Sequence, residues 1–179
     1  YLHEAIESVL CQTFNDLEFL IIDDASTDNS VEIINSYNDS RIKLLINDKN
    51  IGQTASLNKG LVRAQGEYVA RFDQDDVCLP KRLEEQVIFF KNNPSVSIVC
   101  SREYSIDEKG EKIGAWNREL NNYGAFLGYV ILGINPIWTP SVMFIKNDIM
   151  QLDGFDENFG PASDFELWSR IAIKRLNAR

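Results

Sequence analysis

Short apolar runs alternate with amphipathic segments along most of the chain. The run Leu17–Ile22 is nearly continuous, as in a strand that is buried on both faces, whereas residues 1–12 place Leu2, Ile6 and Val9 on one helical face. Strands that alternate with helices predict an α/β fold, Rossmann-like, with a mainly parallel sheet flanked by helices. The other expected strands are 42–46, 67–72, 96–100 and 139–145, and the other expected helices are 29–37, 53–64, about 80–92 and one that begins at 163 or 164.

The chain begins inside a helical pattern and has no initiator Met. Because helices of α/β proteins usually follow a strand, we expect that a first strand lies upstream and that segments are missing from both ends. The 179 residues are enough for a substantial core, so we expect one domain over 1–179.

Composition narrows the class of protein. The net charge of −9 argues against nucleic acid as a partner. Cys11, Cys78 and Cys100 are an odd number without CxxC spacing, which favours free thiols in a reducing compartment. No apolar run approaches the ~18 residues that span a bilayer, and no signal peptide is visible. We therefore expect a cytoplasmic protein, and we leave open a peripheral association with the inner face of the membrane.

A cluster of three acids follows the expected strand 67–72. Asp73, Asp75 and Asp76 lie within four residues, so they repel one another unless they are hydrated or neutralised. A hard divalent cation such as Mg²⁺ or Mn²⁺, with its preference for oxygen ligands, is the usual neutraliser. The alternative is a solvated acidic turn in which an Asp caps the next helix.

A second acidic pair, Asp23 and Asp24, follows the strand Leu17–Ile22. Capping of the next helix accounts for Ser26, Thr27 or Asp28, but it does not require this pair. In parallel sheets, ligands bind at the carboxyl ends of the strands, so both acidic groups should lie on one rim. A carboxylate there can accept hydrogen bonds from a nucleotide base or ribose, and we expect nucleotide contact.

The third acidic position is Asp164, at the start of the last expected helix, in which Leu167 and Ile171 are apolar. It can be a functional carboxylate. Alternatively, it is a helix cap or a first-turn acid that the helix dipole stabilises.

Taken together, these motifs resemble the family 2 glycosyltransferases, which have the GT-A fold. The likeness covers nearly the whole chain and lies in the order and spacing of the motifs. It implies an inverting enzyme that uses Mg²⁺ or Mn²⁺ and takes a sugar from a nucleotide-diphosphate donor, most often a UDP-sugar. The implied acceptor is a hydroxyl of a saccharide or of a lipid-linked molecule, in polysaccharide or glycoconjugate synthesis. The motifs are Asp23-Asp24-Ala25-Ser26, Asp73-Gln74-Asp75-Asp76, Gly154-Phe155-Asp156-Glu157 and Ser163-Asp164-Phe165-Glu166-Leu167-Trp168.

The resemblance also implies a role for each acid. Asp23 and Asp24 are similar to the pair that contacts base and ribose, and Asp164 to the catalytic base. In the acidic cluster, one or two members hold the metal and the others hold ribose or sugar hydroxyls. We assign the metal to Asp75 and Asp76, and donor contacts to Asp73 and Asp75; the division among them stays open.

Two positions depart from the pattern of the family. Ser163 stands where the family usually has Glu before its base, which puts any role of that Glu in doubt. Leu57 stands near the place of a frequent Arg, so a contact to the diphosphate is either lost or supplied by Lys49 or Arg71.

Two other functions stay open at this stage. A nucleotidyltransferase has a similar sheet and similar acids, but it does not require Asp164 and its neighbours. A non-catalytic nucleotide-binding domain of the same fold would bind a nucleotide without transferring a sugar.

Overall fold

The computed structural model describes residues 1–116, 120, 122–174 and 177–178. The strands are β1 (Phe19–Asp23), β2 (Ile42–Ile46), β3 (Tyr68–Ala70), β4 (Val96–Cys100), β5 (Glu103–Ile106), β6 (Lys112–Trp116), β7 (Val142–Ile145) and β8 (Asn177–Ala178). The α-helices are α1 (Leu2–Leu10), α2 (Ser30–Asn35), α3 (Gln53–Arg63), α4 (Arg82–Asn92), α5 (Tyr123–Ile131), α6 (Lys146–Met150) and α7 (Ser163–Ile173), with 3₁₀ turns η1 (Thr139–Ser141) and η2 (Glu157–Ala162).

The strands pair in three separate groups, whose pairings confirm an α/β fold but not a mainly parallel sheet. β1 and β2 are parallel, as are β4 and β8, whereas β7 runs antiparallel to its neighbours β3 and β4. β5 and β6 form a separate antiparallel hairpin. The mixed pattern arises because β7 follows a long excursion through that hairpin and α5, and it enters between β3 and β4 from the opposite direction.

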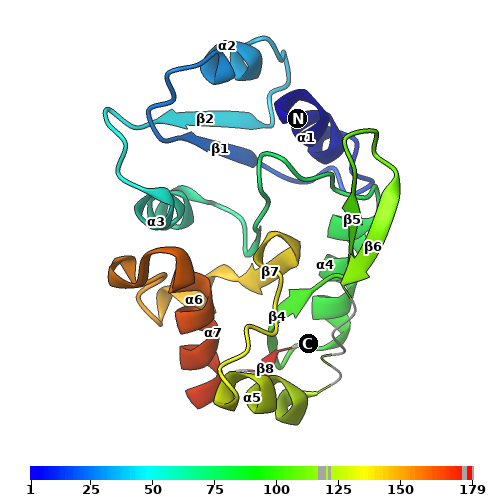
Figure 1. The fold of residues 1–179 in the computed structure, drawn as a ribbon, viewed down its shortest axis with the longest axis vertical. Coiled ribbons are helices and arrows are strands. Elements are labelled where there is room, and N and C mark those ends of the chain that lie inside the picture. Colours follow the sequence, from blue (N-terminus) through cyan, green and yellow to red (C-terminus); the bar gives the residue numbers. More distant parts are fainter. Residues whose placement is uncertain (117–119, 121, 175–176, 179) are drawn as a thin grey trace.

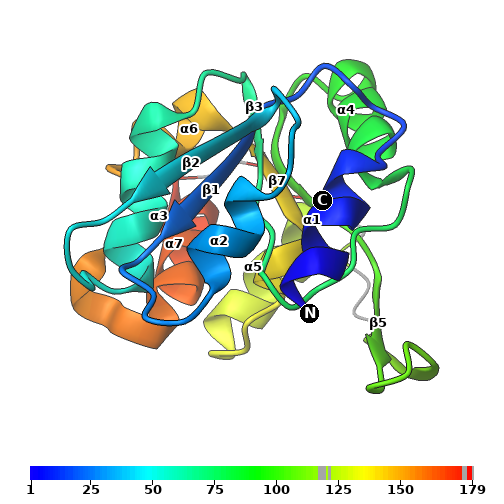
Figure 2. The same cartoon turned by 90° about the horizontal axis from the view of Figure 1, so that it is seen from above.

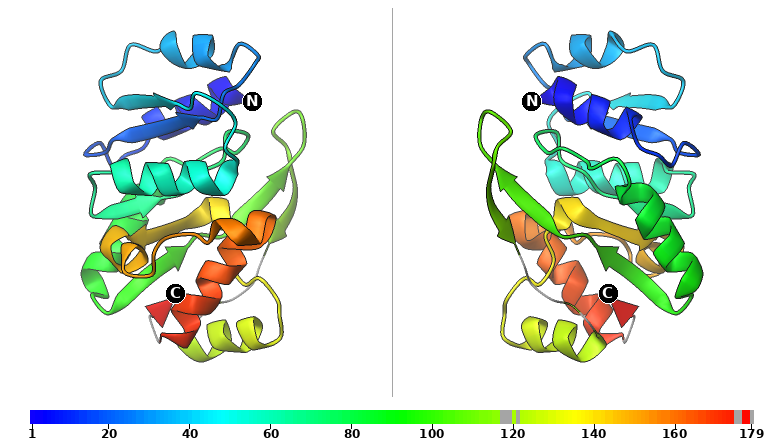
Figure 3. Two further views of the ribbon diagram at one scale, coloured as in Figure 1. Left: turned by 90° about the vertical axis from the view of Figure 1, so that its left-hand side faces the viewer. Right: turned by 90° about the vertical axis from the view of Figure 1, so that its right-hand side faces the viewer.

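The strands stack along the long axis of the molecule and helices cover both faces. Figure 1 shows α2 beyond β2 at one end and α5 at the other. Figure 3 shows α3 and α7 on one face of the stacked strands, and α1 and α4 on the opposite face. The β5–β6 hairpin projects beside this body (Figure 2).

The hydrophobic pattern explains how the helices lie on the strands. Leu83, Val87 and Phe90 recur at helical spacing, and all three are buried where α4 packs over β4. On the other face, Trp168 of α7 is fully buried and its indole ring meets Phe155 edge-on at 6.5 Å between ring centroids.

Two expected strands are shorter in the structure, and the strand expected over 67–72 is formed by Tyr68–Ala70 alone. The strand expected over 139–145 begins only at Val142, because Pro140 lies in the 3₁₀ turn η1. Within the apolar segment 121–133, which has no clear period, residues Tyr123–Ile131 form α5; Asn121 lies outside the described residues. Because this helix is apolar on most of its faces, its hydrophobic residues do not recur with the helical period, and the sequence pattern does not indicate a helix.

Gly60, inside α3, lies close to β1. A Cβ atom at this position would collide with the Cδ1 atom of Ile22. The glycine therefore lets α3 approach the strand that carries Asp23 and Asp24, and this close packing offsets the low helix propensity of Gly.

Among the helices of the described residues, none is both long enough and apolar enough to cross a bilayer.

Candidate functional site

The three predicted groups of acids follow β1, follow β3 and begin α7. Asp23 is the last residue of β1, and Asp73 to Asp76 form the turn between β3 and α4. Asp164 is the second residue of α7.

Asp24 holds the loop that leads into α3. Its Oδ1 atom accepts hydrogen bonds from the Nδ2 atom of Asn47 at 2.8 Å and the backbone N–H of Ile51 at 2.9 Å, and its Oδ2 atom accepts one from the N–H of Gly52 at 2.8 Å. Partial burial opposes ionisation, but the hydrogen bonds from Ile51, Asn47, Gly52 and Ser56 prevail and lower the pKa of Asp24. Asp24 is therefore an ionised anchor for this loop.

Asn47, at the end of β2, extends this network and was missed by the sequence analysis. Its side chain is buried; the amide also donates to Ser56 Oγ at 2.9 Å and accepts from Lys59 Nζ at 2.6 Å. The signal that could have revealed it is positional, because Asn47 follows β2 just as the acidic pair follows β1, and parallel strands bring both to one edge.

Asp23 points inward rather than into solvent. It is only 6% exposed, and its Oδ2 atom accepts a hydrogen bond from the backbone N–H of Ser26 at 3.1 Å. Neither Asp23 nor Asp24 caps α2; near its start, Asp28 accepts a hydrogen bond from the N–H of Ser30 at 3.0 Å. The expectation that capping does not require the acidic pair is thus confirmed.

The acidic turn after β3 contains carboxylates that repel one another and an arginine that partly balances their charge. An oxygen of Asp73 lies 2.7 Å from the Nη1 atom of Arg71. Burial first, and then repulsion from Asp73 and Asp75, raises the pKa of Asp76, although Arg71 and Arg82 partly oppose this rise. The alternative in which an Asp caps α4 is wrong, because the N-cap position is Lys81 and no side chain caps that helix.

Two partly buried ionisable residues, Arg82 and Glu103, lie near the acidic turn. Arg82 donates from Nη2 to the backbone carbonyls of Arg71 at 2.9 Å and Val142 at 3.2 Å. Burial, together with the charge of Asp76, raises the pKa of Glu103 to about 7, while a hydrogen bond with Ser141 and the charge of Arg82 act against this rise. The sequence analysis missed Glu103, which starts β5 far from any acidic motif.

The acidic turn suits a divalent cation, although the described residues do not supply a complete set of ligands. Within the described part of the chain, no three His, Cys, Asp or Glu side chains converge on one point. Mg²⁺ is usually held by one or two carboxylates together with substrate phosphates and water, so such a cage is not required. The oxygen donors and the repulsion that raises the pKa of Asp76 fit a hard cation at Asp75 and Asp76.

Asp164 is held in place by two side chains that precede β7. Its Oδ2 atom accepts hydrogen bonds from the hydroxyl of Thr139 and from the Nδ2 atom of Asn135, the latter at 3.1 Å. Its Oδ1 atom accepts one from the backbone N–H of Phe165 at 2.6 Å. Ala162 occupies the N-cap, so Asp164 is a first-turn acid rather than a cap.

Contacts around the start of α3 connect the acidic pair after β1 with the start of α7. The hydroxyls of Thr54 and Ser163 lie 3.1 Å apart, which joins the first turns of α3 and α7. Gly52, the N-cap of α3, is the same residue that donates to Asp24. Ser141 lies in the turn η1 and hydrogen-bonds Glu103. The first residue of the same turn, Thr139, donates a hydrogen bond to Asp164.

The motif Gly154-Phe155-Asp156-Glu157 has a structural explanation. The Nδ2 atom of Asn58 in α3 donates to the carbonyl of Phe155 at 2.8 Å, and its Oδ1 atom accepts from the N–H of Phe155 at 2.9 Å. Gly154 has φ +70°, and a Cβ there would lie 2.7 Å from Asn58 Oδ1. The motif fixes α3 against the segment that leads into α7.

The acids that follow β1 and β3 stand at strand ends of an α/β scaffold, which is where open α/β sheets usually bind their ligands. The profile of Glycosyl transferase family 2 matches residues 1–151, and the chain belongs to this family. An uncharacterized glycosyltransferase of Methanocaldococcus jannaschii, MJ1057, is 34% identical over 176 residues, which cover 95% of this chain and 59% of that protein. The chain therefore spans a little over half of this relative.

Solved structures support the same fold. TarS of S. aureus, residues 1–349 in complex with UDP, is 19% identical and superposes with a TM-score of 0.79 over 100% of this chain and 54% of its own. The mannosyltransferase PcManGT of Pyrobaculum calidifontis, in complex with GDP-Man and Mn²⁺, is also 19% identical, with a TM-score of 0.73 over 99% of this chain and 49% of its own. These neighbours confirm the expected GT-A fold.

Proposed function

We propose that this domain transfers a sugar, with inversion, from a nucleotide-diphosphate donor to a hydroxyl acceptor, in a reaction that depends on a divalent cation. One observation carries the proposal: the start of α3 joins Asp24, after β1, to the start of α7. The charge of Asp76, after β3, acts on Glu103, which hydrogen-bonds Ser141 in the turn that also contains Thr139, the partner of Asp164. UDP in TarS and GDP-Man with Mn²⁺ in PcManGT support a nucleotide-sugar donor. A UDP-sugar is the donor we propose.

Each acidic residue contacts a different part of the donor. Asp23, Asp24 and Asp73 contact the nucleoside, with Asp24 acting both directly and through the loop that it orders. Asp75 shares donor contacts and, with Asp76, holds Mg²⁺ or Mn²⁺. When bound, the cation neutralises the charge that develops on the departing diphosphate. This arrangement explains how a chain of net charge −9 binds a polyanion.

Asp164 is the proposed catalytic base. Its carboxylate accepts the proton of the acceptor hydroxyl while the acceptor oxygen bonds to the anomeric carbon, and the bond from that carbon to the diphosphate breaks with its electron pair. A single displacement of this kind inverts the anomeric centre. Thr139 and Asn135 hold the carboxylate in one orientation for this step.

The acceptor is proposed only by class. It is a saccharide or a lipid-linked molecule in polysaccharide or glycoconjugate synthesis, reached by a cytoplasmic protein that can associate with the inner face of the membrane. Nucleic acid is not proposed as a partner because the net charge is negative.

Two variants test the proposal by separating binding from chemistry. Asp164→Asn should lower turnover at least ~100-fold, the low end for loss of a general base, with unchanged Mn²⁺-dependent UDP binding. Asp76→Ala should instead weaken UDP binding and remove its dependence on Mn²⁺. The matched control is Glu108→Gln, at the exposed tip of the β5–β6 hairpin.

Each failure of this test has a distinct meaning. Equal loss of UDP binding and turnover in Asp164→Asn would refute the base assignment. Nucleotide binding with neither sugar transfer nor donor hydrolysis would instead support the non-catalytic alternative. Release of pyrophosphate from a nucleoside triphosphate would support a nucleotidyltransferase.

A further inference from the structure

Lys59 of α3 is a partly buried cation to which the proposed function gives no role. Its Nζ atom donates a hydrogen bond to the Oδ1 atom of Asn47 at 2.6 Å. Asn47 is only 4% exposed, and its backbone N–H donates to the carbonyl of Asp23 at 2.9 Å. The backbone of Asn47 is therefore fixed, and its side-chain amide is the part that can still take two orientations.

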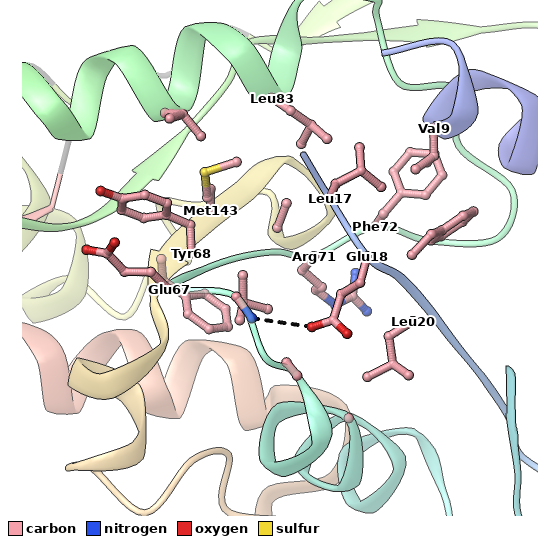
Figure 4. A pocket seen from close by; sticks show the side chains of 18 of the residues that line it. Val9, Leu17, Glu18, Leu20, Glu67, Tyr68, Arg71, Phe72, Leu83 and Met143 are labelled. Atoms are coloured by element: carbon pink, nitrogen blue, oxygen red, sulfur yellow. Dashed lines mark hydrogen bonds between the residues drawn. The ribbon is translucent and has the colours of Figure 1, made fainter. Parts of the chain in front are cut away.

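The packing of α3 against β1 places Lys59 beside this amide. Glu18, which precedes β1, accepts hydrogen bonds from the backbone N–H groups of Gln65 and Gly66, just beyond the end of α3 (Figure 4). Gly60, the residue after Lys59, lets the helix approach β1 closely. The position of Lys59 is thus a consequence of how the helix is held.

The charge of Lys59 determines which way the amide of Asn47 faces. An ammonium group can only donate hydrogen bonds, so it requires the amide oxygen on its side. The NH₂ group then faces Asp24, donating to its Oδ1 atom at 2.8 Å, and Ser56, donating to its Oγ atom at 2.9 Å. If the amide were turned over, its NH₂ group would face the ammonium and its oxygen would face the carboxylate, which is unfavourable at both ends.

Asp24 consequently offers only acceptors to a ligand. Its carboxylate accepts hydrogen bonds from Asn47, Ile51 and Gly52, and its Oδ2 atom, which accepts only one of these, can take another donor. A nucleobase meets such an acceptor with an N–H group. Uracil carries a proton on N3, whereas cytosine has an unprotonated N3 at the same place, which would face the carboxylate.

We propose that Lys59 is a positioning residue that determines nucleobase specificity. By fixing the amide of Asn47, it keeps Asp24 an acceptor and so favours uracil over cytosine. The inference rests on the proposed function, in which Asp24 contacts the nucleoside. Lys59 acts through one intervening side chain, without touching the nucleotide.

The test measures the dissociation constants of UDP and CDP by calorimetry, with Mn²⁺ present. The two nucleotides carry the same charge and the same ribose, so a general loss of attraction or of loop order weakens both and leaves their ratio unchanged. The parent should bind UDP roughly 10-fold more tightly than CDP, because cytosine would set two acceptors against each other. Lys59→Met frees the amide of Asn47 and should bring the ratio to within about 3-fold.

Two further variants serve as controls. Lys59→Arg keeps a cationic donor and should retain most of the preference for UDP. Lys43→Met removes the same charge from an exposed position of β2 and should match the parent. Without nucleotide, carbon-13 NMR should show a higher pKa of the Asp24 carboxyl in Lys59→Met than in the parent, since the hydrogen bond from Asn47 is weakened.

The outcomes separate this inference from the proposed function. If UDP binds to Lys59→Met with the ratio of the parent, or if the pKa of Asp24 is unchanged, the role of Lys59 is refuted while the proposed function stands. Equal changes in Lys43→Met, or equal binding of UDP and CDP by the parent, would also refute that role. Binding of neither nucleotide by the parent would overturn the proposed function, and the selectivity with it.

Discussion

At the scale of single residues, Asp24 shows how one carboxylate can serve both a loop and a ligand. Three hydrogen bonds to its oxygens order residues 47–52, and its Oδ2 atom, which accepts only one of them, retains capacity for another donor. A ligand bound there would meet a preformed loop, which lowers the entropy lost on binding.

We expect Asp24→Asn to destabilise the fold by about 1–2 kcal/mol, because its NH₂ group must face a donor, either a backbone N–H or the amide of Asn47. Thermal unfolding measures the loss, and hydrogen exchange should be faster at Ile51 and Gly52. Asp48→Asn, an exposed change in the same loop, is the control. Identical behaviour of the two variants would refute the anchoring role.

The raised pKa of Glu103 predicts that the stability of the fold depends on pH. Its pKa is raised from 4.5 to about 7 in the fold, so the fold favours the protonated form. The stability that this provides is complete below about pH 4.5 and is lost as the pH rises through about 7. Glu103→Gln stays neutral, so without metal it should match the parent near pH 5 and exceed it by about 1 kcal/mol at pH 8, after allowance for solvent screening.

Melting curves of the parent and Glu103→Gln at pH 5, 6.5 and 8 measure this effect. Glu108→Gln, on the exposed hairpin tip, should show no such trend. A constant difference between Glu103→Gln and the parent over this range would contradict the assignment.

At the scale of elements, the position of α7 depends on its link to α3. Asn58 bonds both backbone groups of Phe155, and Gly154 leaves the space for that side chain. Because this segment leads into α7, the same contacts determine where Asp164 lies.

Gly154→Ala should destabilise the fold by about 1–3 kcal/mol, since the new Cβ would clash with Asn58 and φ is +70°. The control is Gly128→Ala in α5, where a Cβ meets nothing within 4 Å. That change should be neutral, or stabilising by up to about 1 kcal/mol through helix propensity. Chemical denaturation of both variants tests the contrast, and an equal effect of the two would contradict it.

The elements also show where sequence patterns suffice. The strands 42–46 and 96–100 match β2 and β4 at both ends, because short apolar runs between turn residues identify buried strands. The direction of β7 was not predictable, since the same alternation suits parallel and antiparallel neighbours. Likewise, Glu103 and Asn135 lie near the acids only through tertiary contacts, and no local spacing marks them.

At the scale of the whole molecule, the acids that follow β1 and β3 come from two different groups of strands, since β1 pairs with β2 and β3 pairs with β7. The spacing between them is therefore a property of the assembled sheet rather than of either strand.

The most direct test of the proposed function is a thermal-shift screen of this chain with UDP, GDP, dTDP and CDP, each with and without Mn²⁺. A ligand that binds only the folded state at about 100 times its Kd adds ~2.7 kcal/mol, or roughly 5–10 °C in Tm for a chain of this size. We predict such a shift for one nucleotide, UDP, and only with Mn²⁺. No shift for any nucleotide, or equal shifts without Mn²⁺, would contradict a metal-dependent nucleotide-sugar site.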